Sequence, residues 1–367
     1  MNANSYLEVD LKAITKNALE IRREIGSGTK LIPVLKGNAY GLGAVRVAEA
    51  LVKNCAVEMI ALSHAEEGVE IRKAGINCRI MTMSIPLDWQ VREAAEYGLI
   101  LPLGSFRQFE VLKKAAAVLD RKIEIQIKLD TGLHRIGFTE EETDRLCEEL
   151  IRYREYLDIA GIFSHFYDDN PEHMEKQAAC FRAGIEKIRT AGIDPGICHI
   201  ASSASVEASA MYHFDAVRIG RRLYLDNPDI PTGRIREAVS FRAFLTDIRE
   251  RKAGETLGYS GEYTIKKDSR VGVLSIGYGD GLSPELAKAG APVLINGRRA
   301  ALLCLCMDQG FVDLDGIDCQ PGDEVTIFGY DENGNLLSSQ MIASLIGNYE
   351  GCGLTNALTT RVERRYI

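Results

Sequence analysis

The sequence lacks most features that mark secreted, metal-binding or membrane-spanning proteins. Its nine cysteines are scattered without a Cys-x-x-Cys pair, and its six histidines show neither His-x-His nor His-Glu-x-x-His spacing. Neither a disulfide framework nor a metal site is therefore predicted. No apolar run reaches the roughly 18 residues that span a bilayer, and the N-terminus has neither the charged nor the apolar region of a signal peptide. We expect a cytoplasmic chain whose own residues make no membrane contact.

An excess of positive charge is also missing. The formal net charge is -8 at pH 7, and the densest basic run is the short C-terminal segment 361–367. Proteins that bind nucleic acid or anionic membranes usually concentrate Lys and Arg in one segment or on one face. We therefore expect neither partner.

The sequence does contain a regular alternation of strand and helix signals between residues 29 and 220. Short apolar runs alternate with segments in which apolar residues recur at positions i, i+3 and i+4. The predicted strands comprise residues 30–36, 59–63, 79–83, 99–103, 123–130, 159–166, 197–202 and 216–220. Eight strands separated by helices are typical of a (β/α)8 barrel of the TIM type, and the chain is long enough for one. An open doubly wound sheet is the competing arrangement.

The pattern changes after residue 230. Apolar runs there are joined by tight turns, for which Asn296-Gly297 and segment 331–335 are hairpin signals. We therefore predict an α/β protein with two domains. A (β/α)8 barrel would occupy residues 1–230, and a mostly β C-terminal domain would occupy residues 231–367.

Polar residues follow the predicted barrel strands at the end where barrel active sites are built. These residues are Lys36, Lys128, Arg135, His165, Ser202, Ser203, Arg218 and Gly220. Loops after the seventh and eighth strands of such barrels commonly bind phosphate, for which Ser203 and the backbone around Gly220 are suited. A lysine opposite a phosphate site suggests pyridoxal 5'-phosphate, whose aldehyde reacts with a lysine amine. Lys36 is the candidate for that lysine.

Eight ordered motifs along nearly the whole chain resemble those of the alanine racemase family. They are VLKGNAYGLG (34–43), KLDTGLHRIGF (128–138), FSHF (163–166), HIASSAS (199–205), DAVRIG (215–220), LGYSGEY (257–263), IGYGDGL (276–282) and CLCMDQ (304–309). Each motif alone is weak, but together they make the resemblance specific. It implies an isomerase that uses pyridoxal 5'-phosphate to racemise a small amino acid with two bases.

The resemblance implies that Lys36 and Tyr259 are these catalytic bases. Lys36 would hold the cofactor covalently and then exchange a proton on one face of the substrate. Tyr259 would serve the opposite face from the other subunit, so the active form would be a homodimer with shared active sites. Tyrosine is a poor base at neutral pH, because its side chain ordinarily titrates near about 10. His165 and Arg218 are the implied supports for its phenolate.

The same resemblance implies roles for the charged barrel residues. Arg218 would face the ring nitrogen of the cofactor and keep it unprotonated, because arginine does not readily give up a proton. Arg135 would meet the substrate carboxylate or the tyrosine oxygen with its planar fork. The family's counterpart of Lys128 can be carbamylated, and it then holds that arginine in place.

Cofactor-binding and substrate-binding residues are implied in both predicted domains. Tyr40, Ser203 and Gly220 would bind the phosphate group. The β domain would contribute substrate-side residues to the active site of the partner subunit, namely Tyr278, Met307 and Asp308. The sequence departs from the usual family pattern at several positions that do not include the two bases: Gly37, Leu42, Ser202, Arg221 and Arg222.

The substrate side chain is predicted from Asn356. Many alanine racemases carry a tyrosine near the C-terminus that crowds the substrate methyl group, but here no tyrosine lies between Tyr349 and Tyr366. Asn356 instead resembles the pattern in the soluble half of membrane-bound serine racemases of vancomycin-resistant bacteria. An asparagine takes up less space than a tyrosine and can hydrogen-bond to the hydroxyl of a serine substrate. A hydroxyl that is buried without a hydrogen-bond partner costs about 1 to 3 kcal/mol. We expect turnover of serine with turnover of alanine retained.

Two readings of this prediction stay open. Asn356 could be a turn or capping residue in a plain alanine racemase. The chain could act as a cytoplasmic enzyme or as the cytoplasmic domain of a larger membrane protein. In either case it would supply D-amino acid for peptidoglycan precursors.

Other classes of protein are alternatives. A single-barrel cofactor carrier would lack the β domain. A decarboxylase of the related barrel-plus-β class would use a β-domain cysteine near the substrate, for which Cys304 and Cys306 are candidates, but the LGYSGEY motif favours racemisation. A dinucleotide-dependent oxidoreductase is poorly supported, because GLGAV lacks the third glycine of the fingerprint.

Overall fold

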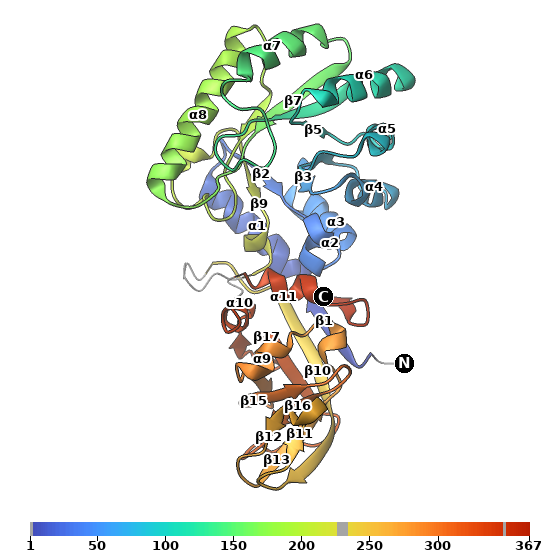
Figure 1. Ribbon diagram of the computed structural model, residues 1–367, viewed down its shortest axis with the longest axis vertical. Coiled ribbons are helices and arrows are strands. Elements are labelled where there is room, and N and C mark those ends of the chain that lie inside the picture. Colours follow the sequence, from blue (N-terminus) through green and yellow to red (C-terminus); the bar gives the residue numbers. More distant parts are fainter. Residues whose placement is uncertain (1–2, 226–233, 348–349) are drawn as a thin grey trace. The chain divides into compact units, whose positions relative to one another are not determined.

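The computed structural model describes residues 3–225, 234–347 and 350–367, which divide into two units (Figure 1). Residues 18–39 and 44–220 form the barrel unit. Residues 1–17, 40–43 and 221–367 form the β unit.

Eight parallel strands close the barrel unit into a ring. They are β2 (Lys30–Pro33), β3 (Met59–Leu62), β4 (Arg79–Thr82), β5 (Leu101–Leu103), β6 (Ile123–Lys128), β7 (Leu157–Phe163), β8 (Ile197–His199) and β9 (Ala216–Ile219). Parallel ladders join β2 to β9, β3 to β4, and β5 through β8 in order. Single bridges join the ladders at Val34–Ala61, Met81–Ile100 and Ser202–Arg218. Closure confirms the predicted (β/α)8 barrel and rules out the open sheet.

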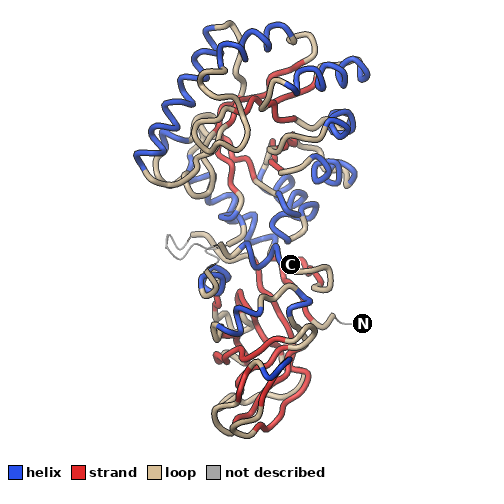
Figure 2. The backbone as a smooth tube through the Cα atoms, in the orientation of Figure 1, coloured by secondary structure: helices blue, strands red, loops and turns tan. Residues whose placement is uncertain are grey.

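Helices lie between most of the successive strands and cover the outside of the barrel (Figure 2). Their bounds are α1 (Leu11–Ile25), α2 (Lys36–Gly41), α3 (Ala44–Cys55), α4 (Ala65–Lys73), α5 (Asp88–Glu96), α6 (Arg107–Leu119), α7 (Thr143–Arg152) and α8 (Pro171–Thr190). α8 shows why these segments are helical. Asn170 caps its first turn, Pro171 opens it, and buried Met174, Phe181 and Ile185 fall on one face. Burying each such side chain contributes about 1.5 to 3 kcal/mol.

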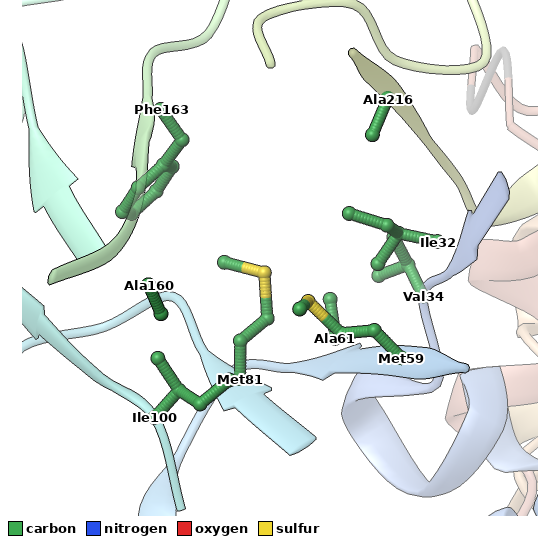
Figure 3. Packing of buried hydrophobic residues seen from close by; sticks show 9 residues of the cluster. All are labelled: Ile32, Val34, Met59, Ala61, Met81, Ile100, Ala160, Phe163 and Ala216. Atoms are coloured by element: carbon green, nitrogen blue, oxygen red, sulfur yellow. The ribbon is translucent and has the colours of Figure 1, made fainter. Parts of the chain in front are cut away.

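The inside of the barrel is a packed core. Side chains two residues apart on a strand point the same way, so Ile32 and Val34 both face inward, as do Met59 and Ala61 (Figure 3). They meet side chains from the other strands, including Met81 and Phe163, and all are buried. This filling leaves the functional groups to the strand ends.

The β unit is built on a nine-stranded sheet. Its strands are β1 (Ser5–Val9), β10 (Val239–Arg251), β13 (Ser269–Leu274), β14 (Pro292–Ile295), β15 (Arg298–Leu305), β16 (Gly310–Asp313), β17 (Glu324–Tyr330), β18 (Leu336–Leu337) and β19 (Glu363–Tyr366). β11 (Thr256–Leu257) and β12 (Tyr263–Thr264) form a separate two-stranded sheet. The α-helices of this unit are α9 (Pro284–Lys288), α10 (Ser339–Ser344) and α11 (Cys352–Ala357). β10 also pairs with β17, which folds the sheet back on itself. Asn296 and Gly297, both with positive φ, form the predicted hairpin turn between β14 and β15.

The chain's first strand belongs to the β unit. β1 pairs antiparallel with β10, placing Leu7 opposite Phe241, and parallel with β19, placing Leu7 opposite Arg364. From the sequence alone, all of residues 1–230 are predicted to belong to the barrel. The difference arises because β1 is short and its partners lie more than 200 residues away, so no local pattern reveals the pairing. The predicted boundary at residue 230 itself lies outside the described residues.

Candidate active site

The carboxyl ends of the barrel strands carry the predicted barrel-side residues. Lys36 follows β2, Lys128 ends β6, and Arg135 lies in the loop after β6. His165 follows β7, Ser203 follows β8, Arg218 lies on β9, and Gly220 follows it. In a parallel barrel these ends meet at one face, so the strands bring the residues to the same side of the barrel unit.

Lys36 opens one turn of left-handed helix. Residues 37 to 41 of α2 all have positive φ, from 52° at Ala39 to 85° at Gly41. A left-handed conformation costs roughly 1 to 2 kcal/mol for each residue other than glycine, and Asn38, Ala39 and Tyr40 adopt it here. Such strain persists only where the surroundings hold it. One such contact comes from the backbone N–H of Ala44, which donates to Oδ1 of Asn38 at 2.7 Å.

Arg218 is the centre of a buried hydrogen-bond network. Its Nη1 donates to Nδ1 of His199 at 2.6 Å, and its Nη2 donates to Nδ1 of His165 at 3.1 Å and to the carbonyl of Ser164 at 2.7 Å. Burial lowers the pKa of Arg218 to about 9, and the nearby Arg135 adds to this effect. Arg218 therefore stays charged at neutral pH, held by carbonyls and imidazoles.

The network fixes both histidines as neutral tautomers. Because each Nδ1 accepts from Arg218, each ring carries its proton on Nε2. Nε2 of His199 donates to Oε1 of Gln126 at 2.7 Å. Burial, reinforced by Arg218, lowers the pKa of His199 well below its usual range and that of His165 to about 3. His199 lies within the motif at 199–205, but neither it nor Gln126 is predicted as a site residue from the sequence.

Lys128 is buried beside the same network. Its Nζ donates to the carbonyl of Leu129 at 2.7 Å and lies 3.4 Å from Oγ of Ser164. Burial lowers the pKa of Lys128 to about 7, with further lowering by Arg218 and Arg135. At neutral pH a large fraction of Lys128 is an uncharged amine.

Ser203 and Gly220 lie within one hydrogen bond of each other. The backbone N–H of Gly220 donates to Oγ of Ser203 at 3.0 Å. Where the β8 and β9 loops meet, the Ser203 hydroxyl thus accepts from this amide and keeps its own proton to donate to a phosphate oxygen. In the β unit the ring of Tyr40 packs 5.5 Å from that of Tyr224, and burial raises the pKa of Tyr40.

Tyr259 stands on a tight turn of the β unit with 61% of its surface exposed. The turn η3 (Tyr259–Gly261) follows Gly258, whose φ is +77°, and includes Ser260 at φ +55°. Next to it, Sγ of Cys304 lies 3.6 Å from a carboxylate oxygen of Glu262. Burial, reinforced by Glu262, raises the pKa of Cys304 to about 12.

Arg361 joins the two substrate-side motifs of the β unit. It donates to Oδ1 of Asp308 at 2.8 Å and pairs with buried Asp280 at 3.2 Å. The backbone N–H of Tyr278 donates to the carbonyl of Cys306 at 3.0 Å, so a backbone hydrogen bond also joins the loops bearing Tyr278 and Asp308. Sequence reasoning missed Arg361, because it was read only as part of a short basic run.

Asn356 lies on α11 and is exposed. The α11 backbone packs on Gly41, the last residue of the turn that Lys36 opens. A β-carbon at Gly41 would lie 2.3 Å from the carbonyl oxygen of Thr355 and 3.3 Å from Cα of Asn356. Asn356 and the end of the left-handed turn are thus neighbours within the β unit.

Comparison with models of protein families shows to which family of proteins the chain belongs. The model of the alanine racemase N-terminal domain matches residues 9–228, and that of the C-terminal domain matches residues 238–366. This chain belongs to the alanine racemase family. It is an isomerase that racemises an amino acid, and its cofactor is pyridoxal 5'-phosphate, so the predicted enzyme class and cofactor are confirmed.

Individual alanine racemases resemble the chain over their whole length. That of Pectobacterium atrosepticum is 35% identical over 378 residues, which span 98% of this chain and 97% of that protein. The solved structure from the D-cycloserine-producing Streptomyces lavendulae has a TM-score of 0.93 at 28% identity, covering 100% of this chain and 98% of the other. The Bacillus anthracis enzyme with bound L-Ala-P has a TM-score of 0.90 at 26% identity, covering 100% and 96%.

The residues present fit this family's cofactor. The amine of Lys36 is on an exposed residue at a strand end, where it can bond to an aldehyde. Ser203 and Gly220 offer phosphate donors, and the hydrogen bonds of Arg218 go to carbonyls and imidazoles.

No helix of the described residues has the length and apolarity needed to cross a bilayer.

Proposed function

We propose that this member of the alanine racemase family racemises alanine and serine, with Lys36 and Tyr259 as its two bases. The supporting observation is the way the fold presents them. Lys36 follows a barrel strand and opens a left-handed turn, and Tyr259 projects from a tight turn with 61% of its surface exposed. Racemisation without turning the substrate over requires bases on both faces of its α-carbon.

The cofactor supplies an electron sink that acidifies the α-hydrogen of the bound amino acid. Lys36 would hold it covalently, and Ser203, Gly220 and Tyr40 would bind its phosphate. Arg218 would donate to the ring nitrogen. Because Arg218 stays protonated at neutral pH and donates to carbonyls and imidazoles, it would leave the ring nitrogen unprotonated.

The two bases would move one proton each. Lys36 takes or returns the α-proton on one face, and Tyr259 does the same on the other. His165 is suited to support the tyrosine oxygen, because its Nδ1 is occupied by Arg218 and its Nε2 carries a proton it can donate. Arg135, an exposed cation near His165, would bind the substrate carboxylate.

Lys128 is the proposed site of carbamylation. Its lowered pKa of about 7 leaves it partly as a neutral amine, the form that reacts with carbon dioxide. Arg218 and Arg135 disfavour a third cation beside them and would stabilise the anionic product.

The proposed active form is a homodimer with shared active sites. Large side chains are exposed on the substrate-side motifs of the β unit, where Met307 is 48% and Tyr278 is 40% exposed, and on the turn that bears Tyr259. Aromatic and methionine side chains are enriched at protein–protein interfaces. A second copy of the chain would cover them and receive Tyr259, Tyr278, Met307 and Asp308 into its own site.

Asn356 is the proposed determinant of serine turnover. Its Cα is a near neighbour of Gly41, which closes the turn that follows Lys36. An asparagine there would leave room for a hydroxymethyl group and pair with its hydroxyl. The D-amino acid formed would enter peptidoglycan precursors, including the serine-ending precursors that accompany vancomycin resistance.

The decarboxylase alternative is less well supported. It would use a β-domain cysteine near the substrate, but Sγ of Cys304 lies against Gly258 and both domains match alanine racemase family models. Chiral analysis of products separates the two, since a racemase yields the opposite enantiomer and a decarboxylase yields an amine.

The test of the proposal is covalent attachment of the cofactor. Purified protein given pyridoxal 5'-phosphate should absorb near ~420 nm, lose that band on borohydride reduction, and carry the label on Lys36. Absence of the band, or a label on another lysine, would overturn the assignment.

A further inference from the structure

Glu67 caps helix α4 with one of its two carboxylate oxygens. It is the third residue of α4, and its Oε2 accepts from the backbone N–H groups of Ser63 at 2.9 Å and His64 at 3.0 Å. These bonds satisfy donors at the start of the helix, as a glutamate at this position commonly does. Both bonds use Oε2, so the second carboxylate oxygen of Glu67, Oε1, takes no part in capping α4.

The other oxygen of Glu67 reaches the residues that follow Lys36. Oε1 accepts from the backbone N–H of Gly37 at 2.6 Å and from that of Asn38 at 3.4 Å. The first N–H groups of any helical turn have no acceptor within the turn, and this holds for a left-handed turn as well. The next N–H along, that of Ala39, already bonds to the carbonyl of Leu35 at 2.8 Å.

We propose that Glu67 is a positioning residue for Lys36. Bonds to a carboxylate are stronger than bonds between neutral groups, and Gly37 and Asn38 come directly after the lysine. Glu67 thus fixes the backbone direction in which the chain leaves β2, and it anchors that turn to the start of α4. This inference rests on the proposed role of Lys36 as the cofactor lysine.

Two variants of Glu67 and one matched control test the inference. Glu67→Gln keeps the shape but replaces one acceptor oxygen by an amide NH2, which cannot accept from a backbone N–H. Glu67→Asp keeps the charge at the start of α4 but is one methylene too short to serve both amide pairs. Glu66→Gln is the control, because Glu66 is the adjacent exposed residue and its carboxylate accepts from Gln90 instead.

The first readout is amide hydrogen exchange of residues 36–41 in protein without cofactor. Both Glu67 variants should exchange Gly37 and Asn38 about tenfold faster or more than the wild type, and Glu66→Gln should not. The second readout is steady-state kinetics per cofactor-bearing site. Both Glu67 variants should lower kcat by about tenfold while KM stays within about twofold, since orientation of the base is lost and substrate contacts are kept.

Two results would overturn the inference. One is unchanged exchange at Gly37 and Asn38 in both variants. The other is faster exchange with kcat unchanged, which would make Glu67 a helix cap only. Failure of the proposed function gives a different result: wild-type protein would then carry no cofactor on Lys36, whereas the exchange data would still report whether Glu67 holds the turn.

Discussion

Gly258 packs directly against the thiol of Cys304. A β-carbon at Gly258 would lie 2.3 Å from Sγ of Cys304, and the φ of +77° at Gly258 is one that other residues rarely adopt. Tyr259 follows immediately. The turn that presents Tyr259 therefore depends on the absence of a side chain at position 258.

Gly258→Ala should displace Tyr259 and lower kcat. Overpacking typically costs about 1 to 3 kcal/mol of folding stability, so a lower Tm is expected. Displacement of the catalytic side chain should separately lower kcat by roughly tenfold or more. Gly254→Ala is the matched control, because Gly254 also has positive φ but a β-carbon there would meet nothing within 4 Å. Adding Cys304→Ala to Gly258→Ala should restore part of the lost activity. No recovery would show that the backbone conformation alone, and not the thiol, sets the requirement.

Tyr259→Phe should abolish proton exchange on one face of the substrate only. Phenylalanine keeps the ring but removes the oxygen that exchanges the proton. Incorporation of solvent deuterium would be followed from each enantiomer separately. Equal residual rates from the two enantiomers would contradict the two-base assignment.

Inactive Lys36→Ala and Tyr259→Phe chains should complement each other when mixed. If Tyr259 acts in the partner's site, a mixed dimer contains one site with both bases intact. Recovery of racemase activity after confirmed subunit exchange is the expected result. Persistent inactivity would place both bases in the same chain.

Asn356→Tyr should lower kcat/KM for serine far more than for alanine. The change crowds the pocket and removes the hydroxyl partner, and one satisfied hydrogen bond is worth about 1 to 3 kcal/mol, or roughly 5- to 150-fold in the serine-to-alanine ratio. Both substrates would be measured in both directions with one enzyme preparation. A serine-to-alanine ratio unchanged within about twofold would contradict the serine assignment and leave alanine as the proposed substrate.

With Lys128 unmodified, folding stability should rise with pH between about 7 and 9 because of this lysine. The unfolded chain keeps this lysine protonated up to the ordinary pKa of 10.5, whereas the folded protein releases the proton near 7. The unfolded state therefore binds more protons in this window, and the free energy of unfolding gains about 2 kcal/mol from this group. Lys128→Met should lose that rise when both proteins are unfolded by denaturant at a series of pH values. Parallel curves for the two proteins would show that Lys128 does not titrate there.

The barrel was predictable because its signals are local. Each of its eight strands is a short apolar run, and α8 shows the apolar spacing and the cap that the sequence displays directly. The candidate residues at the strand ends followed from the same alternation. What could not be predicted depends on contacts across long stretches of chain, as for β1 with β10 and β19.

Two features of the candidate site were beyond sequence reasoning for different reasons. The left-handed turn after Lys36 has no sequence signal beyond its glycines, which mark positive φ but do not show that Asn38, Ala39 and Tyr40 share it. Arg361 was overlooked because an arginine in a polar C-terminal run has no local pattern. Its role emerges only from its pairing with Asp280 and Asp308.

The pairing of β1 sets an order of assembly during synthesis. β1 leaves the ribosome before both of its partners, because its antiparallel partner β10 follows more than 200 residues later and its parallel partner β19 later still. All residues of the barrel unit are synthesised after β1 and before β10, so the barrel can close during synthesis. Until β10 and β19 are made, the backbone N–H and C=O groups of β1 have no strand partner. The β unit thus completes last, and a ribosome that stalls before β10 would leave a strand that invites pairing with other chains.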